Sequence, residues 1–487
     1  NLVATTDAAN GSIHMDGLRV DGTVQLTTHG SGDATVVNDA GLTFLASTVR
    51  NLAATATTGN IVDSGVLTVA GTSSFTTSAN NADITLNNTN ALTGTVALNT
   101  SGSGNALIDN GITALNLATS TVGGNLTLTS GHYIIDSSTV TVGGNLVATT
   151  DAANGSIHMD GLRVDGTVQL TTNGSGNATV VNDAGLNFHA STVGGNLVAT
   201  ATTGNISDNS SHANAVAGTS SFTTSQNNAD IYLDNANAFT GAVSLNTTGS
   251  TGNALVDNGT TALNIAASSV GGRLTLTSGN SITDSGTVTV GYGGLVATTD
   301  ANNGAINLGT LAVDGTVQLT TNGNGTATVV NDAGLNFAAS TVGGNLAATA
   351  TTGNMTDGGA LTIAGTSSFT TSANDATIML NSTTNAFTGA VALNTTGSSG
   401  NARIDGGTTA LNIAASSVGG YLGLISGNDI TDSGTLTIGS WLSVMTDANN
   451  GAVNLGTLAV DGHMGLKTHG TGSATVVNDA GFGFGAS

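Results

Sequence analysis

The sequence predicts an all-β fold in which short parallel strands wind into a β-helix, also called a β-solenoid. Three observations lead to this prediction: the chain repeats itself, its apolar residues alternate with polar ones over short stretches, and its composition is almost without the helix-forming residues Glu, Lys and Arg. The 487 residues include 71 Gly but no Pro, Cys or Glu, and only six are Lys or Arg. Glu, Lys and Arg favour helices, whereas the abundant Thr, Val, Asn and Asp favour strands and turns.

The longest repeat spans close to 150 residues. "LVATTDAANGSIHMDGLRVDG" begins at Leu2 and returns at Leu146, and related versions begin at Leu295 and Leu442. We therefore expect one continuous solenoid, with long repeats over 2–145, 146–294 and 295–441 and a partial repeat over 442–487.

A shorter period runs inside each long repeat. A turn followed by an apolar, a polar and an apolar residue recurs at steps of 22 to 25 residues, as between Leu18 and Leu42. Six coils of about 24 residues would then make one long repeat, and about 20 coils the whole chain. The phrases that begin at Leu42 and Leu115 are alike and lie 73 residues apart, so a unit of three coils looks duplicated.

Each coil is predicted to hold three short strands separated by Gly, Asn and Asp corners. In the first repeat we expect strands at 18–20, 24–27 and 34–37, because apolar and polar residues alternate there. Pro is disfavoured in such strands, since each one pairs on both sides and uses its N–H group. Antiparallel sandwiches and propellers are the competing folds, but a propeller blade takes about 40 residues or more.

The charge and hydropathy of the chain disfavour two classes of binding partner, nucleic acids and membranes. The formal net charge of −23 disfavours binding to nucleic acid, which needs clustered basic residues, and no apolar run suits insertion into a membrane. The chain begins inside a repeat, and neither end carries a capping sequence. We therefore expect an uncapped solenoid that belongs to a longer covalent array or stacks end to end with its own copies.

A recurring Asp is the candidate for metal binding. Carboxylates stacked at the coil spacing could hold Ca²⁺, although Asp is also an ordinary turn residue. The residues of this predicted cation ladder are Asp16, Asp39, Asp63, Asp109, Asp136 and Asp160. No cofactor is required, and Ca²⁺ is the one considered. Catalysis is not expected, because Glu is absent and no long insertion interrupts the repeats to build a site.

Two stretches carry a resemblance to a known family. "GGNLTLTSGHYIIDSSTVTVGGNLVATT" (123–150) and "GGRLTLTSGNSITDSGTVTV" (271–290) resemble the β-helical repeat regions of filamentous-haemagglutinin-like bacterial exoproteins of two-partner secretion. They resemble autotransporter passengers more loosely. The resemblance implies a right-handed helix, secretion to the bacterial cell surface or the extracellular space, and a role in adhesion or biofilm matrix.

The function predicted from these observations is a structural or adhesive extracellular fibre or stalk. The alternative is an adhesin that binds carbohydrate or a cell surface through the solenoid face, with host or neighbouring-cell glycans as partners. Exposed aromatic residues would discriminate the two, and those present do not recur in register: Tyr133, Tyr232, Tyr292, Tyr421 and Trp441.

Overall fold

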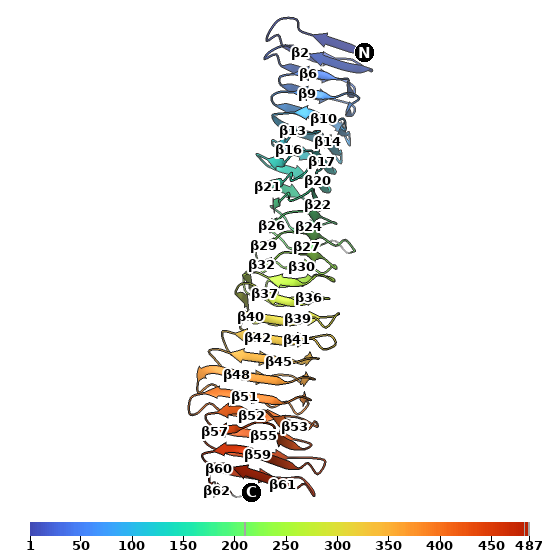
Figure 1. The fold of residues 1–487 in the computed structure, drawn as a ribbon. Coiled ribbons are helices and arrows are strands. Elements are labelled where there is room, and N and C mark those ends of the chain that lie inside the picture. Colours follow the sequence, from blue (N-terminus) through green and yellow to red (C-terminus); the bar gives the residue numbers. More distant parts are fainter. Residues whose placement is uncertain (209–210, 482, 486–487) are drawn as a thin grey trace. The chain divides into compact units, whose positions relative to one another are not determined.

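The computed structural model describes residues 1–208, 211–481 and 483–485, and these form strands, turns and bends. The predicted second repeat includes residues 209–210, and the predicted last repeat includes 482 and 486–487, which lie outside the described residues. Contacts divide the chain into two units, Asn1–Val243 and Ser244–Ser487, with the boundary inside β32 (Val243–Thr248). Each unit is a parallel β-solenoid, as predicted (Figure 1). None of the described residues forms a helix long and apolar enough to cross a membrane.

The strands of each unit form two parallel sheets, which we name sheet A and sheet B. In the first unit, sheet A contains β1 (Leu2–Thr5), β3 (Thr23–Thr27), β5 (Leu42–Phe44), β6 (Ser47–Val49), β8 (Ile61–Asp63), β9 (Leu67–Val69), β11 (Ile84–Leu86), β12 (Ala91–Leu92), β14 (Ala106–Asp109), β17 (Leu126–Ser130), β20 (Leu146–Thr150), β22 (Thr167–Thr172), β24 (Leu186–Phe188), β25 (Thr192–Val193), β27 (Ile206–Asp208), β28 (Ala215–Val216), β30 (Ile231–Leu233) and β31 (Ala238–Phe239). Sheet B of this unit contains β2 (Ile13–Leu18), β4 (Ala34–Asn38), β7 (Leu52–Ala56), β10 (Ser73–Asn80), β13 (Thr95–Ser101), β15 (Leu115–Leu117), β16 (Ser120–Val122), β18 (Ile134–Asp136), β19 (Val140–Val142), β21 (Ile157–Val164), β23 (Ala178–Asn182), β26 (Leu197–Ala201) and β29 (Ser220–Asn227).

The second unit follows the same plan. Its sheet A contains β33 (Ala254–Asp257), β36 (Leu274–Ser278), β39 (Leu295–Thr299), β41 (Thr316–Thr320), β43 (Leu335–Phe337), β44 (Ser340–Val342), β46 (Met355–Asp357), β47 (Leu361–Ile363), β49 (Ile378–Leu380), β50 (Ala386–Phe387), β52 (Ala402–Asp405), β55 (Leu422–Ser426), β58 (Leu442–Thr446), β60 (His463–Lys467) and β62 (Gly483–Phe484). Its sheet B contains β34 (Leu263–Ile265), β35 (Ser268–Val270), β37 (Ile282–Asp284), β38 (Val288–Val290), β40 (Ile306–Val313), β42 (Ala327–Asn331), β45 (Leu346–Ala350), β48 (Ser367–Asn374), β51 (Val391–Thr396), β53 (Leu411–Ile413), β54 (Ser416–Val418), β56 (Ile430–Asp432), β57 (Leu436–Ile438), β59 (Val453–Val460) and β61 (Ala474–Asn478).

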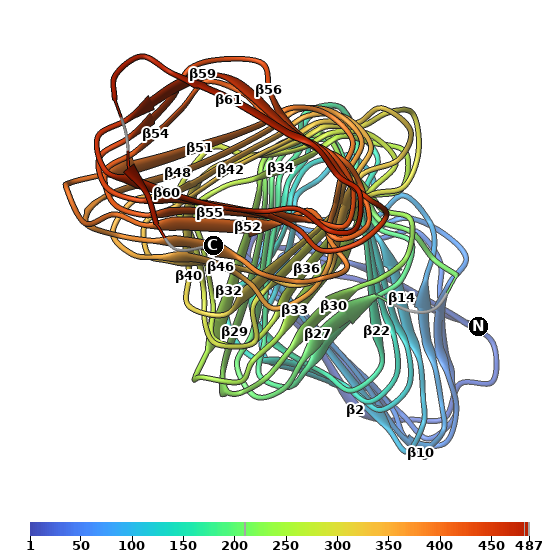
Figure 2. The ribbon, with the colours of Figure 1, turned by 90° about the horizontal axis from the view of Figure 1, so that it is seen from below.

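Each strand pairs in register with a strand one coil later. Leu2 pairs with Val24, and Leu126 pairs with Leu146, so like residues stack along each unit. Viewed along the coils in Figure 2, successive turns of the chain within each unit overlie one another. Because inward side chains alternate with outward ones along every strand, the stacked apolar residues form a continuous core inside each unit.

The coils are shorter and more numerous than predicted. Leu42 pairs with Ile61 and Ile206 with Ile231, so the coil length varies from 19 to 25 residues. Seven successive pairings in sheet A lead from Leu2 to Leu146, so the long repeat holds seven coils rather than six. The described residues make about 23 turns, whereas about 20 were predicted.

The reason for the wrong coil count lies in the sheets. Leu18 belongs to sheet B, whereas the similar triplet that begins at Leu42 belongs to sheet A. The step from the triplet at Leu18 to the triplet at Leu42 therefore joins opposite sheets of the solenoid and is not the length of one coil. Because half of a seven-coil repeat is three and a half coils, the related phrases at Leu42 and Leu115 fall on opposite sheets. The duplicated unit is three and a half coils, not three.

The number of strands in a coil alternates in the same way. In some coils sheet A supplies one strand of five residues and sheet B supplies two of three, as in β17, β18 and β19. In others the roles are exchanged, as in β5, β6 and β7. The prediction of three strands holds for such coils, whereas the coil of β3 and β4 contains two strands of five residues.

Two of the three strands predicted in the first repeat are confirmed. The segments 24–27 and 34–37 lie in β3 and β4, but 18–20 is not a strand, since β2 ends at Leu18. In the second repeat the equivalent residues Leu162 to Val164 are a strand because they pair with Val140 to Val142 of the preceding coil. The first repeat lacks that partner strand among the described residues.

Phenylalanine rings from successive coils pack against one another in the core of each unit. In the first unit, the ring centroid of Phe222 lies 6.2 Å from that of Phe188 and 5.5 Å from that of Phe239. The second unit repeats this arrangement at Phe369, whose ring lies between those of Phe337 and Phe387. Such tilted and edge-to-face contacts between buried rings add to the stabilisation that apolar burial provides.

We predict that Phe222→Ala destabilises the first unit by about 3–5 kcal/mol, because the ring is 1 % exposed and its removal leaves a cavity between neighbouring coils. Urea unfolding and amide hydrogen exchange would measure the effect. Exchange should accelerate first in the strands that pair with β29. Tyr292→Ala, which removes a ring that is 87 % exposed, serves as the control. Equal effects of the two substitutions would contradict the prediction.

Candidate functional site

The six predicted aspartates do not form one column. Asp63 and Asp109 end strands of sheet A, whereas the other four lie in or directly after strands of sheet B: Asp16, Asp39, Asp136 and Asp160. In the strand registers Asp63 pairs with Phe44, Asp109 with Thr129, and Asp136 with Leu117. The described residues contain no group of three or more His, Cys, Asp or Glu that could hold a metal ion. Calcium binding therefore stays a prediction, without the ladder that motivated it.

The buried aspartates instead bind N–H groups of the following coil. The carboxylate of Asp63 accepts hydrogen bonds from Asn87 N (2.9 Å) and Asn90 Nδ2 (2.7 Å). The carboxylate of Asp136 accepts them from Asp160 N (3.0 Å) and Gly161 N (2.9 Å). Corners turn the backbone out of the strand ladder, and these side chains satisfy the donors exposed there.

The same contacts return in later repeats. Asp208 accepts a hydrogen bond from Asn237 Nδ2 at 2.8 Å, and Asp357 accepts one from Asn385 Nδ2 at 2.7 Å. These residues are the counterparts of Asp63 and Asn90. Because both partners recur together, the carboxylate belongs to the corner that joins successive coils.

The remaining aspartates have simpler surroundings. Asp109 Oδ1 accepts a hydrogen bond from Gly111 N at 2.8 Å within its own corner. Asp39 pairs with Arg19 at 2.7 Å, and the carboxylate of Asp16 lies 3.5 Å from His14 Nε2. Asp160 repeats the contact of Asp16, with His158 at 3.5 Å. These exposed pairs contribute little to stability, because solvent screens them.

Burial raises the proton affinity of Asp136, Asp208 and Asp405. Desolvation raises the pKa of Asp136 above its ordinary value of 3.8, against the opposing hydrogen bonds from Gly161 and Asp160. Desolvation also raises the pKa of Asp208 and of Asp405. The charged form of each group is therefore harder to keep in the folded chain than in the unfolded chain.

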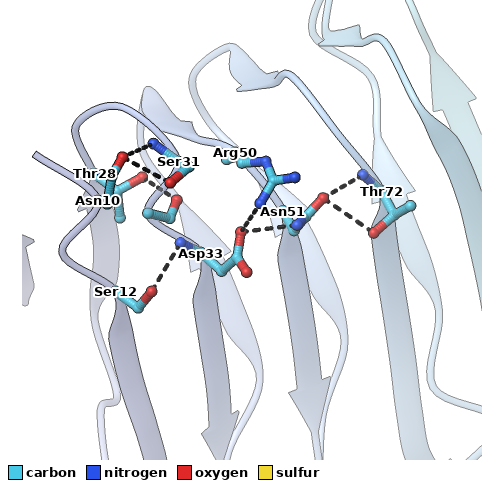
Figure 3. Close-up of polar contacts among 9 residues, drawn as sticks. Asn10, Ser12, Thr28, Ser31, Asp33, Arg50, Asn51 and Thr72 are labelled. Carbon is cyan, nitrogen blue, oxygen red and sulfur yellow. Dashed lines mark hydrogen bonds and ion pairs between the residues drawn. The ribbon is translucent and has the colours of Figure 1, made fainter.

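Side-chain amides form a second set of links at an outer corner (Figure 3). Asn10 Oδ1 accepts hydrogen bonds from Ser31 N (2.8 Å) and Ser31 Oγ (2.7 Å) one coil later. Asn51 Nδ2 donates to Asp33 Oδ1 (2.8 Å), and Asn51 Oδ1 accepts from Thr72 N (2.7 Å). Each Asn thus takes the place of a backbone acceptor where the strands have ended.

Further along the first unit these links join into a ladder. Asn105 Oδ1 accepts a hydrogen bond from Asn125 N, Asn125 Oδ1 from Asn145 N, and Asn145 Oδ1 from Thr167 N, each at 2.8 Å. This ladder was missed in the sequence analysis. Its signal is the Asn that directly precedes the first apolar residue of a strand in "GGNL".

A third kind of link between coils is buried in the interior of the solenoid, at the Asn of the repeated phrase "VVNDAG". Asn182 is 1 % exposed and its Nδ2 donates to the carbonyls of Val164 (3.0 Å) and Gly185 (2.6 Å). Its Oδ1 accepts a hydrogen bond from Val164 N (2.8 Å). The side chain therefore satisfies both backbone groups of Val164. The same clamp on the preceding corner is formed by Asn38, Asn331 and Asn478.

These features define a class of protein: a repetitive parallel β-solenoid whose repeated polar residues hold successive coils together. The chain belongs to the family described as Repeats of unknown function (DUF5649), whose model matches residues 31–99, 103–171, 175–246, 251–306 and 324–394. Successive matches begin 72 to 76 residues apart, so the family repeat corresponds to the unit of three and a half coils. No curated protein and no solved structure matches the chain.

We predict that Asn182→Ala destabilises the first unit by about 3 kcal/mol or more, because it removes the side-chain partner of one buried N–H and two carbonyl groups at about 1–3 kcal/mol each. Urea unfolding would measure the change. Asn187→Ala is the matched control, since Asn187 Oδ1 is buried without a hydrogen-bond partner. If the control costs as much as Asn182→Ala, the clamp does not carry the stability assigned to it.

The raised pKa of Asp136 predicts a pH dependence with a definite sign. The folded chain holds this proton more tightly than the unfolded chain, so its contribution to stability increases as pH falls through the raised pKa towards 3.8 and is lost as pH rises. The stability of the native protein relative to Asp136→Asn should therefore increase between about pH 7 and about pH 4, measured by urea unfolding. Asp16→Asn, which removes an exposed carboxylate, is the control for loss of charge. A constant difference across this range would refute the prediction.

Proposed function

We propose that this solenoid is a structural segment of an extracellular fibre or stalk, and that its role is to extend that fibre. The observation that carries the proposal is the repetition of its joints. The Asn clamp recurs at Asn38, Asn182, Asn331 and Asn478, and each side chain bonds both the N–H and the carbonyl of a Val 18 residues earlier. Selection for a pocket would favour departures at one place, whereas a fibre favours the same joint in every repeat.

The outer surface supports the same proposal. A groove of about 480 Å³ lies on sheet B of the second unit, and its lining includes the small outward residues Ala347, Ser368 and Ala392. It does not interrupt the coils. We propose no catalytic activity, because this groove offers none of the paired acids and bases that hydrolysis of a glycan requires.

Charge bears on how such segments would assemble. A net charge of −23 keeps parallel copies apart at low ionic strength, so lateral bundles need cations between them. Strands at an open end of a solenoid offer unpaired N–H and C=O groups, which favours stacking end to end. We propose that copies join through their ends, or through further repeats of one longer polypeptide, and that Ca²⁺ acts between chains.

A position outside the cell rests on the resemblance of segments 123–150 and 271–290 to filamentous-haemagglutinin-like exoproteins. Antibodies raised against the purified chain should label intact producing cells, and external protease should remove the label. Labelling only after the cells are opened would overturn this part of the proposal.

Electron microscopy of the purified chain tests the fibre. We expect filaments whose axial repeat shortens by about 34 Å in a variant that lacks residues 146–294, because seven coils at about 4.8 Å are removed. Leu146 and Leu295 occupy equivalent positions, so this deletion preserves the repeat at the junction. Micrographs at low and millimolar Ca²⁺ would show whether the cation bundles the filaments. Separate particles under all these conditions would overturn the proposal of self-assembly.

A further inference from the structure

The outer face of sheet A changes character in the last coils of the second unit. In an earlier stretch of that unit, Thr277, Thr298 and Thr320 stack in register on the outside of the sheet. The equivalent column after Asp405 is apolar and then basic: Ile425, Met445 and Lys467. A uniform scaffold has no use for this local change.

A neighbouring column changes at the same coils. Where Thr275, Val296 and Gln318 stand in the earlier stretch, the last coils have two glycines with a serine between them. The replacements in register are Gly423, Ser443 and Gly465. Removing side chains from the middle of a strand weakens it, so these glycines require a reason in packing.

Two aromatic rings lie beside these glycines. The Tyr421 ring would have to shift to admit a side chain at Gly423, whereas a Cβ on Gly465 would make an ordinary van der Waals contact with Trp441. A Cβ atom on Gly423 would lie 2.7 Å from Tyr421 Oη, and one on Gly465 would lie 3.5 Å from the Trp441 indole. The ring centroids of Tyr421 and Trp441 are 5.9 Å apart with an interplanar angle of 73°. Because Leu422 pairs with Leu442, these two rings precede equivalent residues of successive coils, so the expectation that no aromatic residues recur in register is wrong for this pair. The glycines thus form a floor on which the two rings lie. We call these four residues the aromatic platform.

The outer face of sheet A is more buried at the platform than in the earlier stretch. All five residues of β55 are buried, including the outward Gly423 and Ile425, whereas the outward residues of β36 are half-buried. Trp441 itself is 47 % exposed. An aromatic ring that is packed on one side and open on the other is fixed in position, and it offers solvent a large apolar surface.

We propose that the aromatic platform binds a neutral hexopyranose unit of a glycan. The apolar C–H face of a sugar ring matches the flat apolar surface of an indole, while a nearby Ser443 and the phenol of Tyr421 present polar groups for its hydroxyls. The sugar is neutral because the net charge of −23 repels acidic glycans. The site goes beyond the fibre, since a fibre needs no such departure from its repeat.

The chain contains one Trp, so its fluorescence reports on this platform alone. Titration of the full chain with cellohexaose, chitohexaose and a β-linked galactohexaose should change Trp441 emission saturably for at least one sugar. Calorimetry should then show binding weakened about tenfold or more by Trp441→Ala and by Tyr421→Ala, as for aromatic residues at the centre of an interface.

Gly423→Thr is the sharper variant, because it restores the residue found at the equivalent Thr275 and forces the Tyr421 ring off its floor. It should weaken binding without loss of fold, checked by circular dichroism. Tyr292→Ala, which removes an exposed ring elsewhere in the second unit, should leave the affinity unchanged.

Three results would overturn the platform proposal. They are no saturable response to any of the three sugars, binding that survives Trp441→Ala, and a Trp441 emission change caused by protein concentration alone, which would indicate a second copy on the platform. If the chain forms filaments that bind no sugar, the fibre proposal stands and only the platform proposal fails. Sugar binding by separate particles would do the reverse.

Discussion

The structure of each unit depends on one constraint: every coil must present the backbone of the next coil with hydrogen-bonding groups in the same register. Within strands the parallel ladder meets this constraint by itself. At the corners the ladder stops, and Asn and Asp side chains supply the missing acceptors, as Asn125 does for Asn145. Because these contacts run from one coil to the next, a polar residue that would be an ordinary surface residue in a globular protein becomes a joint here. The frequent Asn and Asp residues at the corners follow from this requirement.

The second regularity is the alternation of the two sheets. A repeat of three and a half coils places equivalent residues on sheet A and sheet B in turn, so both sheets are built from one sequence pattern. Leu42 and Leu115 illustrate this relation, since they begin similar triplets in opposite sheets. The exchange of one five-residue strand for two three-residue strands follows from it. Sheets A and B are therefore equivalent in sequence, although within one coil they hold different numbers of strands. A substitution made in every copy of the family repeat would change both sheets of a unit.

The sequence was sufficient to predict the fold class and insufficient to predict the coil. Alternation of apolar and polar residues identified β3 and β4, and the scarcity of Glu, Lys and Arg disfavoured helical folds. The predicted coil length was wrong because the same sequence phrase occurs on both sheets. Sequence periodicity alone does not show whether two copies of a phrase are separated by a whole number of coils. The roles of Asp63 and Asp136 could not be read from spacing, because their partners, such as Asn90 and Gly161, lie about one coil further along. Only the strand registers reveal which residues of successive coils meet.

The same registers distinguish structural residues from candidate functional ones in a protein this regular. A residue that keeps its contacts in every copy, such as Asn182, serves the joint between coils. Residues that depart together in one place, while the inward residues beside them keep their pattern, are under a different requirement. Tyr421, Trp441, Gly423 and Gly465 satisfy that description, since two rings and the two glycines beneath them lie among strands whose inward residues remain apolar. In such a solenoid, a candidate binding site is recognised by correlated exceptions on the outer face rather than by a cavity.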